Sequence, residues 1–98
     1  MMQVRVANLE DHQRLEQVFK AHCSRMNLQW SNFEPVARKI LSHIDFGLVL
    51  LAEDSEQTVH GFMMFTYEWS DWRDGLFFWV QGVEGDDFAL KEMKTFLD

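Results

Sequence analysis

The chain has 98 residues and a formal net charge of −7, and these two values limit its size and its partners. One domain over residues 1–98 fits this length, and a core is possible because 47% of the residues are hydrophobic. Only nine residues are Lys or Arg, and no segment concentrates them. Binding to nucleic acid or to an anionic membrane surface depends on such cations, so we expect neither partner.

Cys23 is the single cysteine, so no disulfide can form within the chain, which fits a reducing, cytoplasmic location. The first residues lack the long apolar run of a signal peptide, and no stretch approaches the roughly 20 apolar residues that span a bilayer.

Nine Phe and four Trp are many for this length. Part of this aromatic surface is therefore expected to meet a partner, a ligand or a second copy of the chain.

The chain begins with the pattern of a strand followed by a helix. Residues 3–6 alternate polar and β-branched side chains, as in a short strand. Asn8 can cap a helix that ends near Asn27, and acids follow it in the first turn, where the helix dipole favours them. The apolar stripe expected on this helix is Leu15, Val18, Phe19, His22 and Met26.

A second helix is predicted to start at Ser31. Ser31 and Glu34 have the spacing of a capping box, and Pro35 would fall in the first turn, where proline is tolerated. Gly47 would end the helix. The buried stripe expected on it is Phe33, Ala37, Ile40, Leu41 and Ile44.

The remaining sequence predicts three strands and a closing helix. Residues 47–52 form a short apolar run, typical of a strand buried on both faces. Residues 59–69 and 76–83 form two more strands, with connections so short that neighbours should be antiparallel. Asp86 or Asp87 caps the last helix, whose apolar side is Ala89, Leu90, Met93, Phe96 and Leu97. The expected fold class is α/β (α+β): a mainly antiparallel sheet of about four strands with helices packed on it, in the order β-α-α-β-β-β-α.

Four segments carry a resemblance to a known family. Residues 50–53 read Leu-Leu-Ala-Glu, and residues 60–65 read His-Gly-Phe-Met-Met-Phe. With the order of elements, they resemble the second and third strands in the front half of the GNAT N-acetyltransferases. Residues 67–72, Tyr-Glu-Trp-Ser-Asp-Trp, resemble the aromatic end of the third strand in polyamine-type members, and residues 77–83 lie where the fourth strand would be. The resemblance covers about residues 3–97 but only the front half of the family's fold.

The resemblance implies an acetyl-CoA pyrophosphate site after the fourth strand, held by backbone N–H groups and a helix N-terminus. This chain has Glu-Gly-Asp-Asp at residues 84–87, with one glycine, no arginine and three carboxylates. Each carboxylate would repel a pyrophosphate by on the order of a few kcal/mol. The positions that match the family's catalytic glutamate are Trp79 and Val80, both apolar, and the family's later strands have no counterpart. We therefore expect shared architecture without catalytic residues and without a cofactor.

Few other residues suggest chemistry. His12, His22, His43 and His60 lack the spacing of metal ligands, so we expect no metal site, and His22 should lie at the border of the first helical stripe. Cys23 follows His22 directly, and on a helix their side chains point about 100° apart. A buried or half-buried thiol is therefore expected rather than a nucleophile.

The candidate ligand or interface residues surround the loop between the third and fourth predicted strands. They are Tyr67, Glu68, Trp69, Asp71, Trp72, Phe77 and Trp79. Aromatic rings and carboxylates together can bind amines. The alternative is a hairpin tip whose acids, with Asp74, favour solubility and whose aromatic rings pack across the strands.

The fourth predicted strand carries bulky apolar side chains in both directions. Phe77, Trp79 and Gln81 should face one side, and Phe78 and Val80 the other, so we expect the strand to be covered on both faces. If this strand ends the sheet, its open edge would be an aggregation hazard unless covered. We therefore expect a homodimer with this strand or its hairpin at the interface.

Three functions follow from these features. The leading expectation is a non-catalytic GNAT-like binding or interaction protein that is dimeric. The second is a minimal N-acyltransferase with acetyl-CoA held across a dimer, for which Arg73, Lys91 and Lys94 are the nearby cations. The third is a binder of a small apolar or cationic ligand, in an aromatic pocket between the sheet and the first two helices.

Overall fold

A computed structural model describes residues 2–70 and 75–98 of the chain, with the backbone alone for Trp69, Ser70 and Leu76. The elements are β1 (Gln3–Val6), a 3₁₀ turn η1 (Leu9–Asp11), α1 (His12–Met26), α2 (Trp30–Ser42), β2 (Gly47–Glu53), β3 (Val59–Ser70), β4 (Gly75–Gly85) and α3 (Asp87–Leu97). Apart from the short 3₁₀ turn, this is the order that the sequence predicts.

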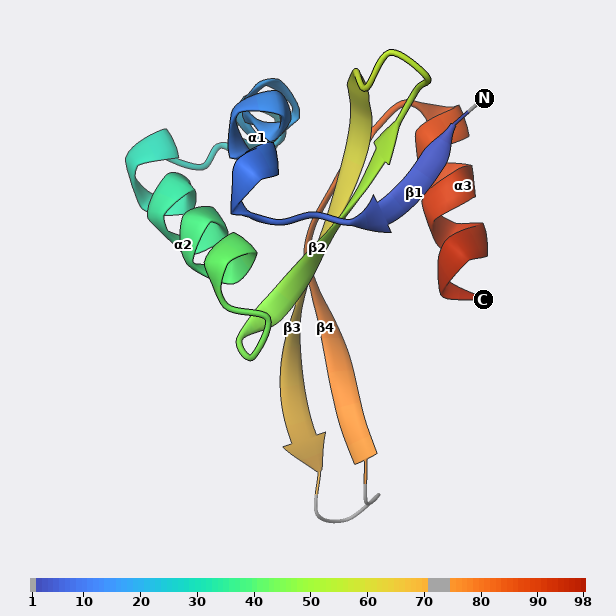
Figure 1. The fold of residues 1–98 in the computed structure, drawn as a ribbon. Helices are drawn as coiled ribbons and strands as arrows, with labels where there is room; N and C mark the ends of the chain where they lie inside the picture. Colours follow the sequence, from blue (N-terminus) through green and yellow to red (C-terminus); the bar gives the residue numbers. More distant parts are fainter. Residues whose placement is uncertain (1, 71–74) are drawn as a thin grey trace.

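The strands form one sheet in the order β1-β2-β3-β4, and every neighbouring pair is antiparallel. α1 and α2 lie on one face of the sheet and α3 on the other (Figure 1). The predicted fold class is confirmed. β4 is an edge strand of this sheet, as the sequence analysis considered.

The boundaries of the first helical segment agree with the prediction. The side chain of Asn8 accepts the backbone N–H of Glu10 at 2.9 Å, and the Asp11 carboxylate accepts the N–H of Asn8 at 2.9 Å. This cap opens η1, which continues into α1. Asn27 ends α1 in the left-handed conformation with φ of 56°, which asparagine tolerates better than most residues.

The predicted capping box of α2 is wrong. α2 starts at Trp30, because the backbone N–H groups of Asn32 and Phe33 both reach the carbonyl of Gln29 at 3.0 Å. Glu34 does not cap the helix, since its carboxylate pairs with Arg38 at 2.9 Å. Pro35 therefore lies deeper in the helix than expected, beyond its first turn.

Gly47 does not end α2 either, because the helix stops at Ser42 and Gly47 opens β2. A Cβ atom at Gly47 would lie 2.1 Å from the carbonyl oxygen of Phe65, so the neighbouring strand requires glycine here. The glycine at this position serves strand pairing rather than helix termination.

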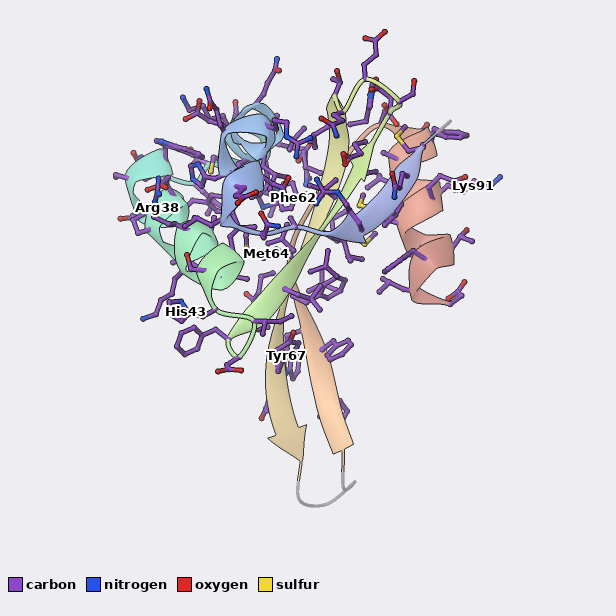
Figure 2. The ribbon with its side chains drawn as sticks, viewed as in Figure 1. Arg38, His43, Phe62, Met64, Tyr67 and Lys91 are labelled. Atoms are coloured by element: carbon purple, nitrogen blue, oxygen red, sulfur yellow. The ribbon has the colours of Figure 1, made fainter. Side chains whose placement is uncertain are left out.

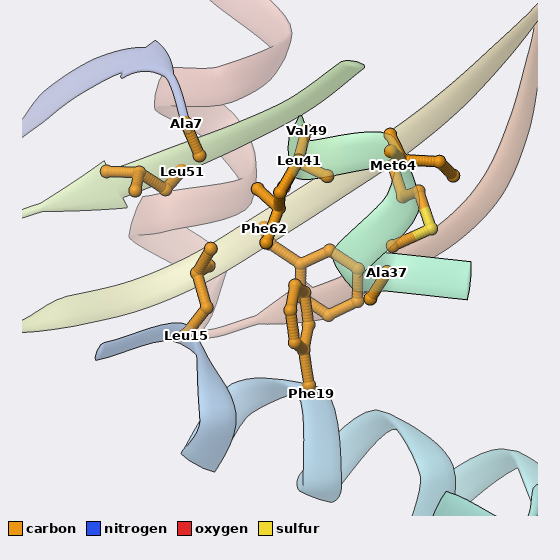
Figure 3. Packing of buried hydrophobic residues seen from close by; sticks show 10 residues of the cluster. Ala7, Leu15, Phe19, Ala37, Leu41, Val49, Leu51, Phe62 and Met64 are labelled. Carbon is orange, nitrogen blue, oxygen red and sulfur yellow. The ribbon is translucent and has the colours of Figure 1, made fainter. Parts of the chain in front are cut away.

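Two hydrophobic layers sandwich the sheet. The layer under α1 and α2 consists of Ala7, Leu15, Phe19, Ala37, Ile40, Leu41, Val49, Leu51, Phe62 and Met64 (Figure 3). The layer under α3 consists of Leu50, Ala52, Phe65, Ala89 and Met93. β2 supplies residues to both layers, so its predicted burial on both faces is confirmed.

The apolar stripes of the helices are shorter than predicted. Met26, Ile44, Phe96 and Leu97 are exposed, since each lies at or beyond the C-terminal end of its helix. His22, expected at the border of its stripe, is only 3% exposed. Its ring packs between those of Phe33 and Phe62, with centroids 5.7 and 5.4 Å away.

A balanced ion network holds β1 in place. The Arg5 guanidinium donates to Asp11 at 2.7 and 2.9 Å and to Glu53 at 2.9 Å, and Arg14 pairs with the same two carboxylates. Asp11 and Glu53 are only 2% and 3% exposed. The hydrogen bond from Arg5 lowers the pKa of Asp11, so this carboxylate stays charged. The network joins β1 to the start of α1 and to the end of β2.

Among the residues that the structure describes, no helix combines the length and the apolar character that crossing a bilayer requires.

Candidate functional site

The turn between β4 and α3 is tighter than the sequence suggests. β4 continues to Gly85 and α3 starts at Asp87, so Asp86 alone joins them. The Asp86 carboxylate accepts the backbone N–H of Ala89 at 2.8 Å, which identifies Asp86 rather than Asp87 as the helix cap. The Asp86 side chain thus already occupies one of the backbone N–H donors at the N-terminus of α3.

Gly85 packs this turn against the start of β3. Its φ of +153° is a conformation that residues with a side chain rarely adopt. A Cβ atom there would lie 2.8 Å from both the Cα atom of Gly61 and the carbonyl oxygen of His60. Because the two backbone segments approach each other so closely here, the turn cannot open into a longer loop.

Arg25, on α1, faces the same turn and is paired with Glu84. Its Nε atom donates to the Glu84 carboxylate at 2.8 Å, and its Nη2 atom donates to the carbonyl of Val83 at 3.0 Å. His22 Nδ1 lies 3.4 Å from the same Glu84 oxygen. The positive charge of Arg25, the cation that contacts the turn, is therefore already neutralised by Glu84.

The other cations considered for a pyrophosphate lie farther away. Lys91 and Lys94 are on α3, about 6 and 10 Å along the helix axis from its first residue at the helical rise of about 1.5 Å per residue. Arg73 lies outside the described residues.

His60 lies between two carboxylates beside the turn. Its Nε2 atom is 2.8 Å from Asp54, and its Nδ1 atom is 3.5 Å from Asp86. The hydrogen bond to Asp54 raises the pKa of His60, and the same pair lowers the pKa of Asp54. Asp86 therefore faces His60 while it caps α3, and the acids of this region interact with groups of the chain itself.

A pocket opens between α2 and the sheet. Its volume is about 300 Å³, and its lining residues are Leu28, Gln29, Asn32, Phe33, Val36, Ile40, Met64, Thr66 and Gln81. None of these side chains carries a formal charge. Three amides and one hydroxyl lie among apolar groups, an arrangement typical of small-molecule sites. The lining comes from α2, the segment before it, β3 and β4, so the pocket lies in part of the region that the ligand-binding hypothesis named, and Phe33 is the aromatic residue that it contains.

A β-bulge in β4 places Gln81 in the pocket. Met64 pairs with Gly82 and Phe65 with Val80, so Gln81 is the additional residue. Its side-chain amide donates to the hydroxyl of Thr66 at 2.9 Å. The sequence did not identify Gln29, Asn32 and Gln81 as pocket residues. Gly82, a glycine within a strand pattern, is the signal that could have indicated the bulge at Gln81.

The predicted ligand residues lie mostly on a protruding hairpin. We define the hairpin arm as residues 67–70 of β3 and 75–80 of β4, which extend past the helices (Figure 1). Figure 2 shows Phe62 and Met64 beside the helices and Tyr67 beyond them. The side chain of Trp69, and all of Asp71 and Trp72, lie outside what the structure describes.

The described candidates on the arm form two separate pairs. The ring of Tyr67 lies 5.4 Å from that of Phe78, on the face that carries α3. The indole N–H of Trp79 donates to the Glu68 carboxylate at 2.7 Å, on the face that carries α1 and α2. Adjacent residues of a strand point to opposite faces, so these pairs do not converge on one ligand. Phe77 is half-buried beside the second pair.

The expected cover over β4 is not supplied by the described residues. Phe78, Trp79 and Val80 are 55%, 54% and 58% exposed, although they point alternately to both faces. The prediction that this strand is covered on both sides is therefore wrong for the single described chain. The physical reason is that the helices end before the arm begins.

Cys23 is buried, as expected, and burial raises the pKa of its thiol. Within residues 2–70 and 75–98, no group of three His, Cys, Asp or Glu side chains is arranged to hold a metal ion.

No protein-family model matches the sequence, and no curated protein matches it. A solved structure, of a possible acetyltransferase from Clostridium difficile 630, is similar with a TM-score of 0.75 and 24% sequence identity. The fold is GNAT-like. The similarity covers 99% of this chain and 66% of the other, so this GNAT-like chain spans about two thirds of that length. At this identity the similarity establishes the fold and leaves the function to the residues.

Proposed function

We propose that this GNAT-like protein is a non-catalytic binding or interaction protein that does not use acetyl-CoA. The observation that supports this most is the β4–α3 turn. One residue connects the elements there, and Glu84 and Asp86 are bonded to Arg25 and to the α3 backbone. A pyrophosphate would have to displace these contacts and then face three carboxylates, which opposes binding.

The groups that acetyl transfer would need support the same proposal. A general base must lie within hydrogen-bond reach of the proton that it removes. Trp79 and Val80 occupy the positions that match the family's glutamate, and neither side chain accepts a proton. The rival function, a minimal N-acyltransferase with acetyl-CoA held across a dimer, would have to obtain both the base and the phosphate donors elsewhere.

Isothermal titration with acetyl-CoA separates these two functions. We expect no heat of binding at micromolar protein, and no acetylation of a panel of amines. A Glu84→Gln, Asp86→Asn double variant is the matched control, since weak binding gained there would identify the carboxylates as the obstacle. Micromolar affinity of the unmodified protein for acetyl-CoA would contradict the proposal.

A second candidate function is small-ligand binding in the pocket beside α2. The lining lacks formal charges, and its amides from Gln29, Asn32 and Gln81 offer both donors and acceptors. This favours a neutral, largely apolar ligand over a cationic one. A volume of about 300 Å³ is at the small end of the range for ligand pockets.

The pocket can be tested with Nile red, a neutral fluorescent probe, and with tetramethylammonium as its cationic counterpart. We expect Nile red fluorescence to rise with the protein and tetramethylammonium to leave the amide NMR spectrum unchanged. Val36→Trp should fill the pocket and abolish the rise, whereas Ile44→Trp, at an exposed position outside the lining, should preserve it. Equal loss in both variants would contradict a site in this pocket.

We also propose that the protein is a homodimer in the cytoplasm. The open, apolar edge at β4 supports the dimer, and the single buried thiol fits a reducing compartment. Sedimentation equilibrium over a range of concentrations tests the first part. A single species of monomer mass at every concentration would contradict it.

A further inference from the structure

We propose that the pocket beside α2 binds a neutral aromatic carboxamide, with the aromatic ring on the floor of the pocket and the carboxamide group at its rim. This inference rests on the second candidate function, small-ligand binding in the same pocket. It adds the chemical class of the ligand, the orientation of the ligand and the residue that selects it, which is Gln81.

The pocket has an apolar floor and a polar rim. Met64 and Ile40, which form the floor, are only 2% and 5% exposed. Gln29, Asn32 and Gln81 belong to the same lining and are exposed. A ligand that matches both parts is amphipathic, because its apolar body displaces water from the floor while its polar group stays at the rim.

The side chains of Phe33 and Met64 favour an aromatic ring as the apolar body. The centroid of the Phe33 ring lies 5.3 Å from that of Phe19 and 6.3 Å from that of Trp30. These contacts order this wall of the pocket before a ligand arrives, which lowers the entropic cost of binding. Aromatic rings pack favourably on other rings and on the sulfur of methionine.

The bulge in β4 places the polar group of Gln81 over this floor. A Cβ atom at Gly82 would lie 3.1 Å from His22 of α1, so Gly82 is on the face of the sheet that carries α1 and α2. Gln81 lines the pocket on the same face. Successive residues of a regular strand point to opposite faces, so the bulge is the reason that both residues share one face.

The Gln81 amide is held in place and still has hydrogen-bonding capacity. It donates one N–H to the hydroxyl of Thr66 at 2.9 Å. Its second N–H and its carbonyl oxygen have no protein partner among residues 2–70 and 75–98, and neither have the side-chain amides of Gln29 and Asn32. A carboxamide has both donors and acceptors, so it can pair with such amides in both directions.

The charges of the protein oppose an ionised ligand in this pocket. None of the lining residues carries a formal charge, so neither a carboxylate nor an ammonium group would find an ion-pair partner there. The net charge of −7 opposes an anion further. The same net charge attracts a cation to the whole protein surface, but salt screens this attraction and it does not select the pocket.

The ligand class is tested with four compounds of similar shape. Benzamide is the neutral carboxamide, acetophenone lacks its N–H donors, benzoate is an anion and benzamidine is a cation at neutral pH. Each is titrated at moderate salt concentration, and its dissociation constant is measured from the amide NMR shifts of the pocket residues. We expect benzamide to bind about fivefold more tightly than each of the other three, the effect typical of one hydrogen bond.

Substitutions at Gln81 test the selecting residue, with folding verified by circular dichroism. Gln81→Leu should weaken benzamide binding about fivefold and leave Nile red binding unchanged. Gln81→Glu places a carboxylate at the rim and should reverse the preference, so that benzamidine binds more tightly than benzamide. Gln17→Glu is the matched control, because it adds the same charge at an exposed position of α1 outside the lining and should preserve the preference for benzamide.

Each other outcome contradicts a defined part of the proposal. Tighter binding of benzoate or benzamidine to the unmodified protein would overturn the neutral class, and equal binding of acetophenone and benzamide would overturn the carboxamide. Unchanged benzamide binding in Gln81→Leu, or the same reversal in Gln17→Glu, would overturn the role of Gln81.

The failure of the ligand class and the failure of the pocket function are distinguishable. Nile red binding that benzamide does not compete away would overturn the ligand class and leave small-ligand binding standing. No binding of Nile red or of any of the four compounds would contradict small-ligand binding in this pocket as well.

Discussion

The two ends of the β3–β4 hairpin have similar compositions and very different surroundings. At one end Phe62 is completely buried, with its ring 4.8 Å from that of Phe19. At the other end Phe78 is 55% exposed and contacts the rings of Phe65 and Tyr67. The difference teaches that an apolar pattern along a strand predicts that its side chains need to be covered by other residues. The pattern does not predict whether those residues belong to the same chain.

The largest expected effect tests this comparison directly. Phe62→Ala should lower the free energy of unfolding by about 3–5 kcal/mol, because it leaves a cavity between α1 and the sheet. Phe78→Ala, measured by urea denaturation at concentrations where the chain is a monomer, should cost less than about 1 kcal/mol. Equal costs would mean that the arm is as well packed as the body.

The junction between β4 and α3 gives the next largest effect. Gly85→Ala combines a conformation unsuited to alanine with a Cβ atom 2.8 Å from the backbone of His60 and Gly61, and should cost about 2–4 kcal/mol. Gly82→Ala is the matched control, since its Cβ atom would meet only side chains of His22 and Phe62 at 3.1 and 3.3 Å. Thermal denaturation should rank Gly85→Ala as the more damaging change.

The cap of α3 contributes less. Asp86→Ala removes the acceptor for the Ala89 N–H and should destabilise the protein by about 1 kcal/mol. Asp87→Ala, one residue later in the first turn, should cost only a few tenths of this, through the helix dipole. Chemical denaturation of both variants distinguishes them, and the reverse order would identify Asp87 as the functional cap.

The smallest effect concerns pH. Pairing with Asp54 raises the pKa of His60, so this contribution to stability is complete below about pH 6.5 and disappears as the pH rises through the folded-state pKa. The pKa of Asp54 is lowered, so its contribution is present above about pH 3.9 and is lost as the pH falls through the lowered value.

We therefore expect the midpoint temperature of thermal unfolding to decrease as the pH is raised from 6 to 8. The decrease should be small, as is typical of an exposed ion pair. His60→Gln should remove this part of the pH dependence. The contributions of the other histidines are the same in both proteins, so they cancel when the two pH profiles are subtracted. An identical pH profile for both proteins would show that the pair does not contribute.

The sequence predicted the fold well where local signals and burial agree. Alternation and short connections gave the order of strands, and Asn8, Asn27 and the acids at the last helix gave three helix ends. The start of α2 was missed because the Ser31–Glu34 spacing is only a local signal. In the folded chain Glu34 pairs with Arg38 instead of the backbone.

The candidate site was less predictable, for a topological reason. The pocket combines Asn32, Met64 and Gln81, which come from one helix and two strands. The position of Gln81 depends on a bulge that breaks the alternation on which strand faces are predicted. The acidic turn was predicted from residue types alone, since charge needs no tertiary information, but its closure around Arg25 and His60 was not.

The ion network at β1 also has a consequence for folding. Arg5 pairs with Glu53, which is 48 positions away in the sequence, so forming this contact requires the closure of a long loop. We expect β1 to dock late in folding and to be released early in unfolding. Its amide protons should therefore exchange with solvent faster than those of β2, through openings that leave the rest of the sheet intact.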